Sequence, residues 1–116
     1  MAYTLFGIPN CDTVKKARTW LNNNHIEFEF HNYKTSGISV KQISLWLEQV
    51  PLKVVFNKAS ATYRKLTAEQ KSNSENHKEA ISLLVESPSM IKRPVLMKDN
   101  QVLAVGFKPE LYEPLF

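Results

Sequence analysis

The chain has one cysteine, Cys11, and its chemistry depends on where it lies. It follows a short aromatic and aliphatic run, Tyr3–Gly7, and precedes a segment with helical periodicity that begins near Asp12. The free N–H groups and the dipole at a helix start stabilise a thiolate, by about 1 kcal/mol and at most about 2. The negative charge of Asp12 acts against a neighbouring thiolate. Strong activation of Cys11 therefore needs a cation from elsewhere in the chain.

A second interpretation of Cys11 stays open, because a lone cysteine is commonly a small buried hydrophobic residue. Position alone does not separate the two interpretations. A single cysteine does exclude an internal disulfide and an all-cysteine metal site. If Cys11 carries out redox chemistry, the partner thiol must come from another molecule.

The apolar pattern predicts the elements that position Cys11. The run Tyr3–Gly7 reads as a buried strand that stops at Pro9, and a helix should follow from Cys11 or Asp12 to the asparagine cluster at 22–24. Residues 27–33 alternate between aromatic and polar side chains, which predicts a second strand.

Residues 38–90 predict a block of short helices. Two helix starts carry a Ser or Thr followed three residues later by Gln, a capping-box pattern: Ser39 with Gln42, and Thr67 with Gln70. A longer helix should begin near Ser74. The apolar runs 95–97 and 102–105 then predict a hairpin, and residues 109–116 predict a final helix.

This order of elements predicts an α/β domain. The first two strands, joined by a right-handed crossover, should lie parallel, and the hairpin should complete a four-stranded mixed sheet covered by helices. The order matches a thioredoxin-like fold with a helical insertion at about 38–90. We expect residues 1–116 to form a single domain.

Arg93 is the best candidate for the missing cation. It is one of three arginines and directly precedes Pro94, at the start of the predicted hairpin. A proline at this point of a thioredoxin-like layout is often cis and packs beside the reactive thiol. Arg93 should then lie near Cys11 and stabilise its thiolate.

Composition narrows the classes of function. Hydrophobic residues make up 43% and charged residues 22%, which is typical of a globular protein. The net charge of +4 is spread along the chain without a basic stripe, so we expect no nucleic-acid partner. No apolar run approaches the length of a membrane span, and the N-terminus lacks a signal-peptide pattern, so we expect a cytoplasmic protein. We interpret the three histidines, His25, His31 and His77, as surface residues and expect no metal site.

Four stretches of the chain carry motifs in order and at suitable spacing. They are GIPNCDTVKKA at 7–17, NK at 57–58 with TYRKL at 62–66, PSMIKRPV at 88–95, and VGFKPE at 105–110. Together they resemble the ArsC family, most closely its YffB-type branch. The resemblance implies a thioredoxin-like fold. The family includes glutathione- and glutaredoxin-linked arsenate reductases, Spx-type regulators that contact RNA polymerase, and YffB-type proteins suggested to be glutathione-dependent thiol reductases.

The resemblance implies roles for single residues. In the arsenate reductases the cysteine matching Cys11 attacks the oxyanion, and three arginines hold that anion. Arg93 matches one of these arginines, whereas Asn57 and Lys108 stand at the other two positions. Because a lysine lacks the planar two-point grip of a guanidinium, we expect little arsenate reduction. Ile8 also replaces the histidine that precedes the cysteine in those reductases.

The resemblance to Spx-type regulators meets a different obstacle. Their redox-switching members carry a second cysteine three residues after the first, where this chain has Val14. An internal disulfide switch is therefore excluded. Binding to RNA polymerase without such a switch remains an alternative, which we do not favour.

The reading that remains is a glutathione-dependent thiol–disulfide reductase, an enzyme in which Cys11 is the nucleophile and Arg93 stabilises its thiolate. Glutathione would be a co-substrate with no bound cofactor, and glutaredoxin a further partner. The two carboxylates of glutathione call for cations and polar groups. The resemblance and the positions in the chain suggest these residues as the glutathione-binding set: Thr13, Lys15, Lys16, Lys58, Arg64, Pro94 and Lys108. Most of these have a structural alternative: Lys15 and Lys16 as a solvated helix face, Lys108 as a helix-start residue, Arg64 as a surface ion-pair partner, and Thr13 as a helix cap.

Overall fold

The computed structural model describes residues 2–116. Their contacts separate them into two units. The first consists of the residues up to Ser36 together with Arg93–Phe116, and the second of Gly37–Lys92. The first unit contains Cys11 and Arg93, so the two residues expected to form the reactive centre belong to the same unit.

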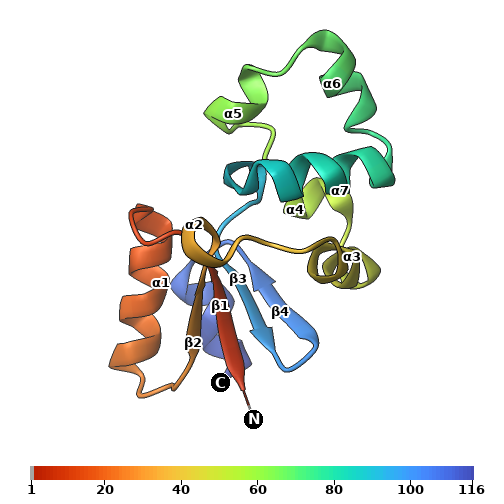
Figure 1. Ribbon diagram of the computed structural model, residues 1–116. Coiled ribbons are helices and arrows are strands. Elements are labelled where there is room, and N and C mark those ends of the chain that lie inside the picture. Colours follow the sequence, from red (N-terminus) through yellow and green to blue (C-terminus); the bar gives the residue numbers. More distant parts are fainter. Residues whose placement is uncertain (1) are drawn as a thin grey trace. The chain divides into compact units, whose positions relative to one another are not determined.

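The first unit is built on a four-stranded mixed sheet in the order β2-β1-β3-β4, which Figure 1 shows as neighbouring arrows. The strands are β1 (Tyr3–Gly7), β2 (Glu29–Asn32), β3 (Val95–Lys98) and β4 (Gln101–Val105). β1 runs parallel to β2 and antiparallel to β3, and β3 pairs antiparallel with β4. The predicted sheet, with its parallel first pair and its hairpin, is confirmed.

The helices of this unit are α1 (Asp12–Asn23), α2 (Tyr33–Ser36), α8 (Pro109–Tyr112) and the 3₁₀ turn η2 (Glu113–Leu115). α1 buries one apolar face, formed by Val14, Ala17 and Leu21. Ala17 and Leu21 belong to one core cluster together with Leu5, Leu96, Ala104 and Tyr112. This packing fixes α1, and with it the residue at its start, against the sheet.

The register of the strands brings several chain segments to one edge of the sheet. Gly7, at the end of β1, pairs with Asn32, and Phe6 pairs with Val95 at the start of β3. Val95 in turn pairs with Val105 near the end of β4. The segments that follow β1, β2 and β4 and the segment that precedes β3 therefore share this edge.

The second unit is helical, as residues 38–90 predict. Its elements are α3 (Val40–Gln49), α4 (Leu52–Val55), α5 (Ala61–Arg64), α6 (Ala68–Asn73), α7 (His77–Glu86) and the 3₁₀ turn η1 (Pro88–Met90). Ser39 accepts a hydrogen bond from the Gln42 N–H, and Thr67 and Gln70 form the reciprocal capping box. The expected helix starts near 39 and 67 are thus confirmed.

Three sequence predictions need correction. The second strand covers only Glu29–Asn32 instead of 27–33, because Tyr33 already begins α2. The Asn32 Oδ1 accepts a hydrogen bond from the Lys34 N–H at 2.9 Å, a local turn that ends the strand. The final helix is split, since α8 passes into a 3₁₀ turn that contains Pro114. His31 is partly buried beside the rings of Phe6 and Tyr33 and is not a free surface residue.

Within residues 2–116 no helix is both long and apolar enough to cross a membrane.

Candidate active site

Cys11 occupies the N-cap position of α1. Its backbone is extended (φ −102°, ψ 126°), and its carbonyl oxygen accepts the first helical hydrogen bond, from the Lys15 N–H at 2.9 Å. The side chain is partly exposed. A thiol placed here faces the N–H groups that the first helical turn leaves without helical partners.

A close approach between β1 and α1 helps to place this helix start. A Cβ atom added at Gly7 would lie 2.8 Å from Cγ2 of Val14. Only glycine therefore lets the first turn of α1 pack this tightly on the end of β1. Val14 is fully buried, so the contact belongs to the core under Cys11.

Several groups act on the pKa of the Cys11 thiol. Burial is the largest single influence and raises it. Hydrogen bonds from the Val14 N–H, the Arg93 side chain and the Thr13 N–H, together with the positive charge of Arg93, outweigh burial. The pKa of Cys11 consequently lies below its usual value, and the site favours a thiolate.

Arg93 reaches Cys11 from the start of β3. The Arg93–Pro94 peptide bond is cis, as the sequence pattern predicts, and Pro94 is buried. The Pro94 carbonyl oxygen accepts a hydrogen bond from the Gly106 N–H at 2.8 Å, which ties the end of β4 to the same place. The side chain of Arg93 hydrogen-bonds to Cys11, so the expected proximity of cation and thiol is confirmed.

Tyr33 is a neighbour of this site that the sequence reasoning missed. It directly follows β2, its side chain is buried, and the charge of Arg93 acts on its hydroxyl. The alternating pattern of residues 27–33 predicts Tyr33 as the last residue of a strand, where an aromatic side chain usually has only a packing role. One feature of the sequence could have indicated this role: Tyr33 comes at the end of the predicted strand that pairs with the strand before Cys11.

Thr13 and Lys108 lie on segments at the same edge of the sheet. Thr13 is the second residue of α1, and its N–H contributes to the thiolate site. The expectation that its side chain caps the helix is wrong, because Cys11 holds the N-cap position. Lys108 is exposed, follows Gly106 by two residues and immediately precedes α8.

Lys15 and Lys16 project from α1 at the rim of a shallow hollow of about 540 Å³. The other lining residues are Thr19, Trp20, Asn23, Phe107 and Pro109. Trp20 and Phe107 both pack edge-on against the Tyr112 ring, with ring centroids 5.6 and 4.7 Å apart. Both aromatic residues therefore have a packing role beside any contact with a ligand.

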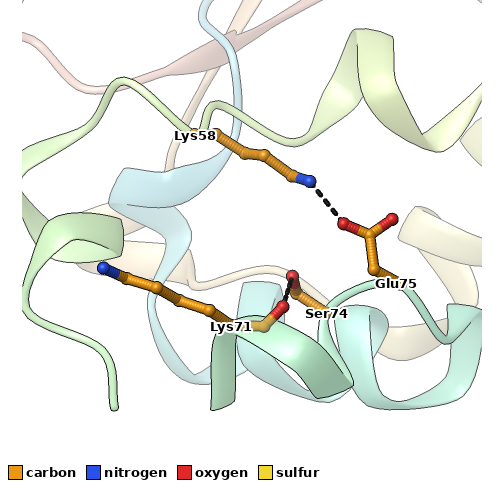
Figure 2. A network of polar contacts seen from close by, with 4 residues as sticks. All are labelled: Lys58, Lys71, Ser74 and Glu75. Atoms are coloured by element: carbon orange, nitrogen blue, oxygen red, sulfur yellow. Dashed lines mark hydrogen bonds and ion pairs between the residues drawn. The ribbon is translucent and has the colours of Figure 1, made fainter. Parts of the chain in front are cut away.

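Lys58 and Arg64 belong to the second unit, whereas Cys11 belongs to the first. The Lys58 Nζ lies 2.6 Å from Oε1 of Glu75, as Figure 2 shows, and this hydrogen bond raises the pKa of Lys58. Figure 2 also shows Ser74 donating to the Lys71 carbonyl oxygen at 2.6 Å. Arg64 is exposed at the end of α5. The charge of Lys58 is thus already paired, which lowers its value as a substrate-binding cation.

Asn57, which the resemblance matches to an arginine position of the arsenate reductases, is held by its own local turn. Its N–H donates to the Met90 carbonyl oxygen at 2.7 Å, and its Oδ1 accepts from the Ala59 N–H at 3.1 Å. Among the described residues, no three His, Cys, Asp or Glu side chains gather where they could hold a metal ion.

Comparisons with known proteins show similarity in sequence and in fold. The solved structure of a YffB protein covers 97% of both chains at 42% identity with a TM-score of 0.91. An arsenate reductase (ArsC) related protein from Brucella melitensis is 43% identical over 98% of this chain and 93% of its own, with a TM-score of 0.77. The global transcriptional regulator Spx of Streptococcus mutans is 31% identical over 92% of this chain and 77% of its own length.

The solved relatives establish the thioredoxin-like fold with its four-stranded mixed sheet and covering helices. The profile of the ArsC family matches residues 6–115, which includes Cys11, Arg93 and the cis-proline. The chain belongs to the ArsC family.

Proposed function

We propose that this protein is a glutathione-dependent thiol–disulfide reductase that uses Cys11 as its single nucleophile. The observation that carries the proposal is the lowered pKa of Cys11, with N–H groups of α1 and the Arg93 side chain directed at the sulfur. A thiolate that forms readily near neutral pH reacts with disulfides, since the thiolate is the attacking species.

The reaction has two exchange steps. The Cys11 thiolate attacks one sulfur of a substrate disulfide, the bond between the two substrate sulfurs breaks, and one half leaves as a thiolate. A glutathione thiolate then attacks the substrate sulfur of the mixed disulfide and releases Cys11 as a thiolate. A second glutathione reduces the resulting glutathione mixed disulfide, so two glutathione molecules supply the two electrons. We place this chemistry in the cytoplasm, where glutathione keeps thiols reduced.

The experiment follows both steps in the wild type and in Cys11→Ser. Reduced protein is mixed with glutathione disulfide, and its intact mass is compared before and after the addition of glutathione. We expect one glutathione to attach to Cys11 and to leave again when glutathione is added, with no attachment in Cys11→Ser. Failure of the wild type to form this adduct, or failure of glutathione to release it, would contradict the proposal.

Arsenate reduction is a second candidate, because a similar solved protein is described as arsenate reductase related. By the resemblance to arsenate reductases, Asn57 and Lys108 stand at two of the three arginine positions of that reaction. We expect turnover of arsenate, with glutathione and glutaredoxin supplied, to be far below that of hydroxyethyl disulfide. Comparable turnover of arsenate and hydroxyethyl disulfide would instead favour an arsenate reductase.

A regulator that binds RNA polymerase is the third candidate, since Spx of Streptococcus mutans is similar over most of the chain. Val14 stands where a resolving cysteine would be needed for a disulfide switch. Binding of this kind would not depend on the thiol. Capture of RNA polymerase by wild type and Cys11→Ser alike, together with no glutathione exchange, would favour the regulator over the enzyme.

A further inference from the structure

The Tyr33 hydroxyl is a buried polar group that the fold itself does not use. The side chain is 4% exposed, and within residues 2–116 its hydroxyl has no hydrogen-bond partner. Burial without a partner costs folding free energy, which a phenylalanine at this position would avoid. The Tyr112 hydroxyl is buried without a partner within the described residues as well, so the position of Tyr33 relative to Cys11, and not the missing partner alone, singles it out.

The position of Tyr33 relates it to the reactive thiol. Asn32, the residue before it, pairs with Gly7 of β1, and Val95, two residues after Arg93, pairs with Phe6 of β1. Tyr33 directly follows β2 and Arg93 precedes β3, the two strands that flank β1, so both residues lie at the edge where β1 leads into Cys11. Lys34 strengthens this link, because its Nζ donates to Oδ1 of Asn10 at 3.4 Å.

Arg93 connects the Tyr33 hydroxyl with Cys11 through charge. The guanidinium hydrogen-bonds to Cys11, and its charge also acts on Tyr33. Burial raises the pKa of Tyr33 well above its usual value, and the charge of Arg93 opposes this only in part. The phenol thus stays protonated and can donate a hydrogen bond.

We propose that Tyr33 is a substrate-binding residue whose hydroxyl donates a hydrogen bond to an anionic oxygen of the molecule that reacts with Cys11. The Tyr33 hydroxyl has no hydrogen bond with Arg93 in the described part of the chain, and an anionic oxygen can accept from a guanidinium and a protonated phenol at once. The site should then prefer thiol reagents and disulfides that carry a carboxylate or another oxyanion. This inference rests on the proposed function only in taking Cys11 as the nucleophile.

Two alkylating reagents of nearly equal size test the preference. Iodoacetate carries a carboxylate and iodoacetamide a neutral amide, and both react with the Cys11 thiolate. Their rate ratio is compared in the wild type, in Tyr33→Phe and in Tyr112→Phe. Tyr112 is the matched control, because it is buried too, its hydroxyl also has no partner within residues 2–116, and it lies in the core cluster beside Trp20 and Phe107.

We expect Tyr33→Phe to lower the ratio of iodoacetate to iodoacetamide rates about tenfold, the effect of losing one hydrogen bond to a charged group. The melting temperature should not fall, since no internal hydrogen bond is lost. Tyr112→Phe should leave the ratio unchanged.

An unchanged ratio in Tyr33→Phe would overturn the inference, and so would a lower melting temperature, which would reveal a structural partner for the hydroxyl. Equal slowing of both reagents with a shifted pH midpoint would also overturn it, because Tyr33 would then act through Arg93. Alkylation needs no glutathione. Failure of the glutathione adduct to form therefore counts against the proposed function alone. The ratio of the iodoacetate and iodoacetamide rates tests the role of Tyr33.

Discussion

At the scale of single residues, the reactivity of Cys11 results from a balance between burial and charge. Burial works against the thiolate, whereas α1 N–H groups and Arg93 favour it more strongly. The sequence predicted Cys11, Arg93 and the cis-proline because each belongs to a recognisable motif. It did not predict Tyr33, because an aromatic residue at a strand end usually has only a packing role. Its relation to Cys11 depends on the pairing of β2 with β1.

A comparison of two lysines tests which cations bind glutathione. Lys108 is exposed and follows the segment that is hydrogen-bonded to Pro94, whereas the Lys58 charge is paired with Glu75. We expect Lys108→Ala to raise the KM for glutathione several-fold with little change in kcat, since it removes binding of a carboxylate. Lys58→Ala serves as the matched control and should leave KM unchanged. The reverse order, with only Lys58→Ala raising KM, would place the binding cation in the second unit.

At the scale of elements, the contact between the end of β1 and the first turn of α1 positions the thiol. The start of α1 was predictable from the Gly-Ile-Pro-Asn stop and the helical periodicity that follows. α2 and α5 were not predictable, because four residues give no periodicity and both depend on local turns that begin with side-chain hydrogen bonds.

Gly7→Ala measures the contribution of this contact. The added Cβ would lie 2.8 Å from Val14 Cγ2, so Val14 or the backbone must move. We expect a loss of about 1–3 kcal/mol in the free energy of unfolding, typical of overpacking in a core. Denaturant unfolding checks the value.

A double variant separates steric overlap from other causes. When Gly7→Ala is combined with Val14→Ala, the added methyl meets no side-chain branch, so the two losses should be less than additive. Strict additivity would mean that the overlap with Val14 is not the source of the loss.

At the scale of the whole molecule, the chain divides into a sheet unit and a helical unit, and the helical unit is inserted between α2 and β3. The thioredoxin-like sheet could be predicted from the order of elements. The division into two units could not, because it depends on the relative density of tertiary contacts, which the sequence pattern does not express.

We nevertheless expect residues 1–116 to behave as one domain. The second unit is connected at both ends to elements of the first unit, α2 and β3. Folding or unfolding of one unit therefore affects the chain segments that anchor the other. Unfolding followed by far-ultraviolet circular dichroism and by tryptophan fluorescence should therefore give coincident transitions. Trp20 lies in the first unit and Trp46 in the second, so the single variants Trp20→Phe and Trp46→Phe report each unit separately. Two different midpoints would show two domains.

The pH dependence of Cys11 alkylation tests the central claim, that this family member holds a thiolate activated by Arg93. Since the pKa of Cys11 lies below its usual value, the rate should reach half its maximum at a lower pH than for a free cysteine, about 8.5. In Arg93→Ala the midpoint should move to higher pH, because the hydrogen bond and the positive charge that favour the thiolate are lost. A wild-type midpoint at or above that of free cysteine, unchanged in Arg93→Ala, would contradict the account.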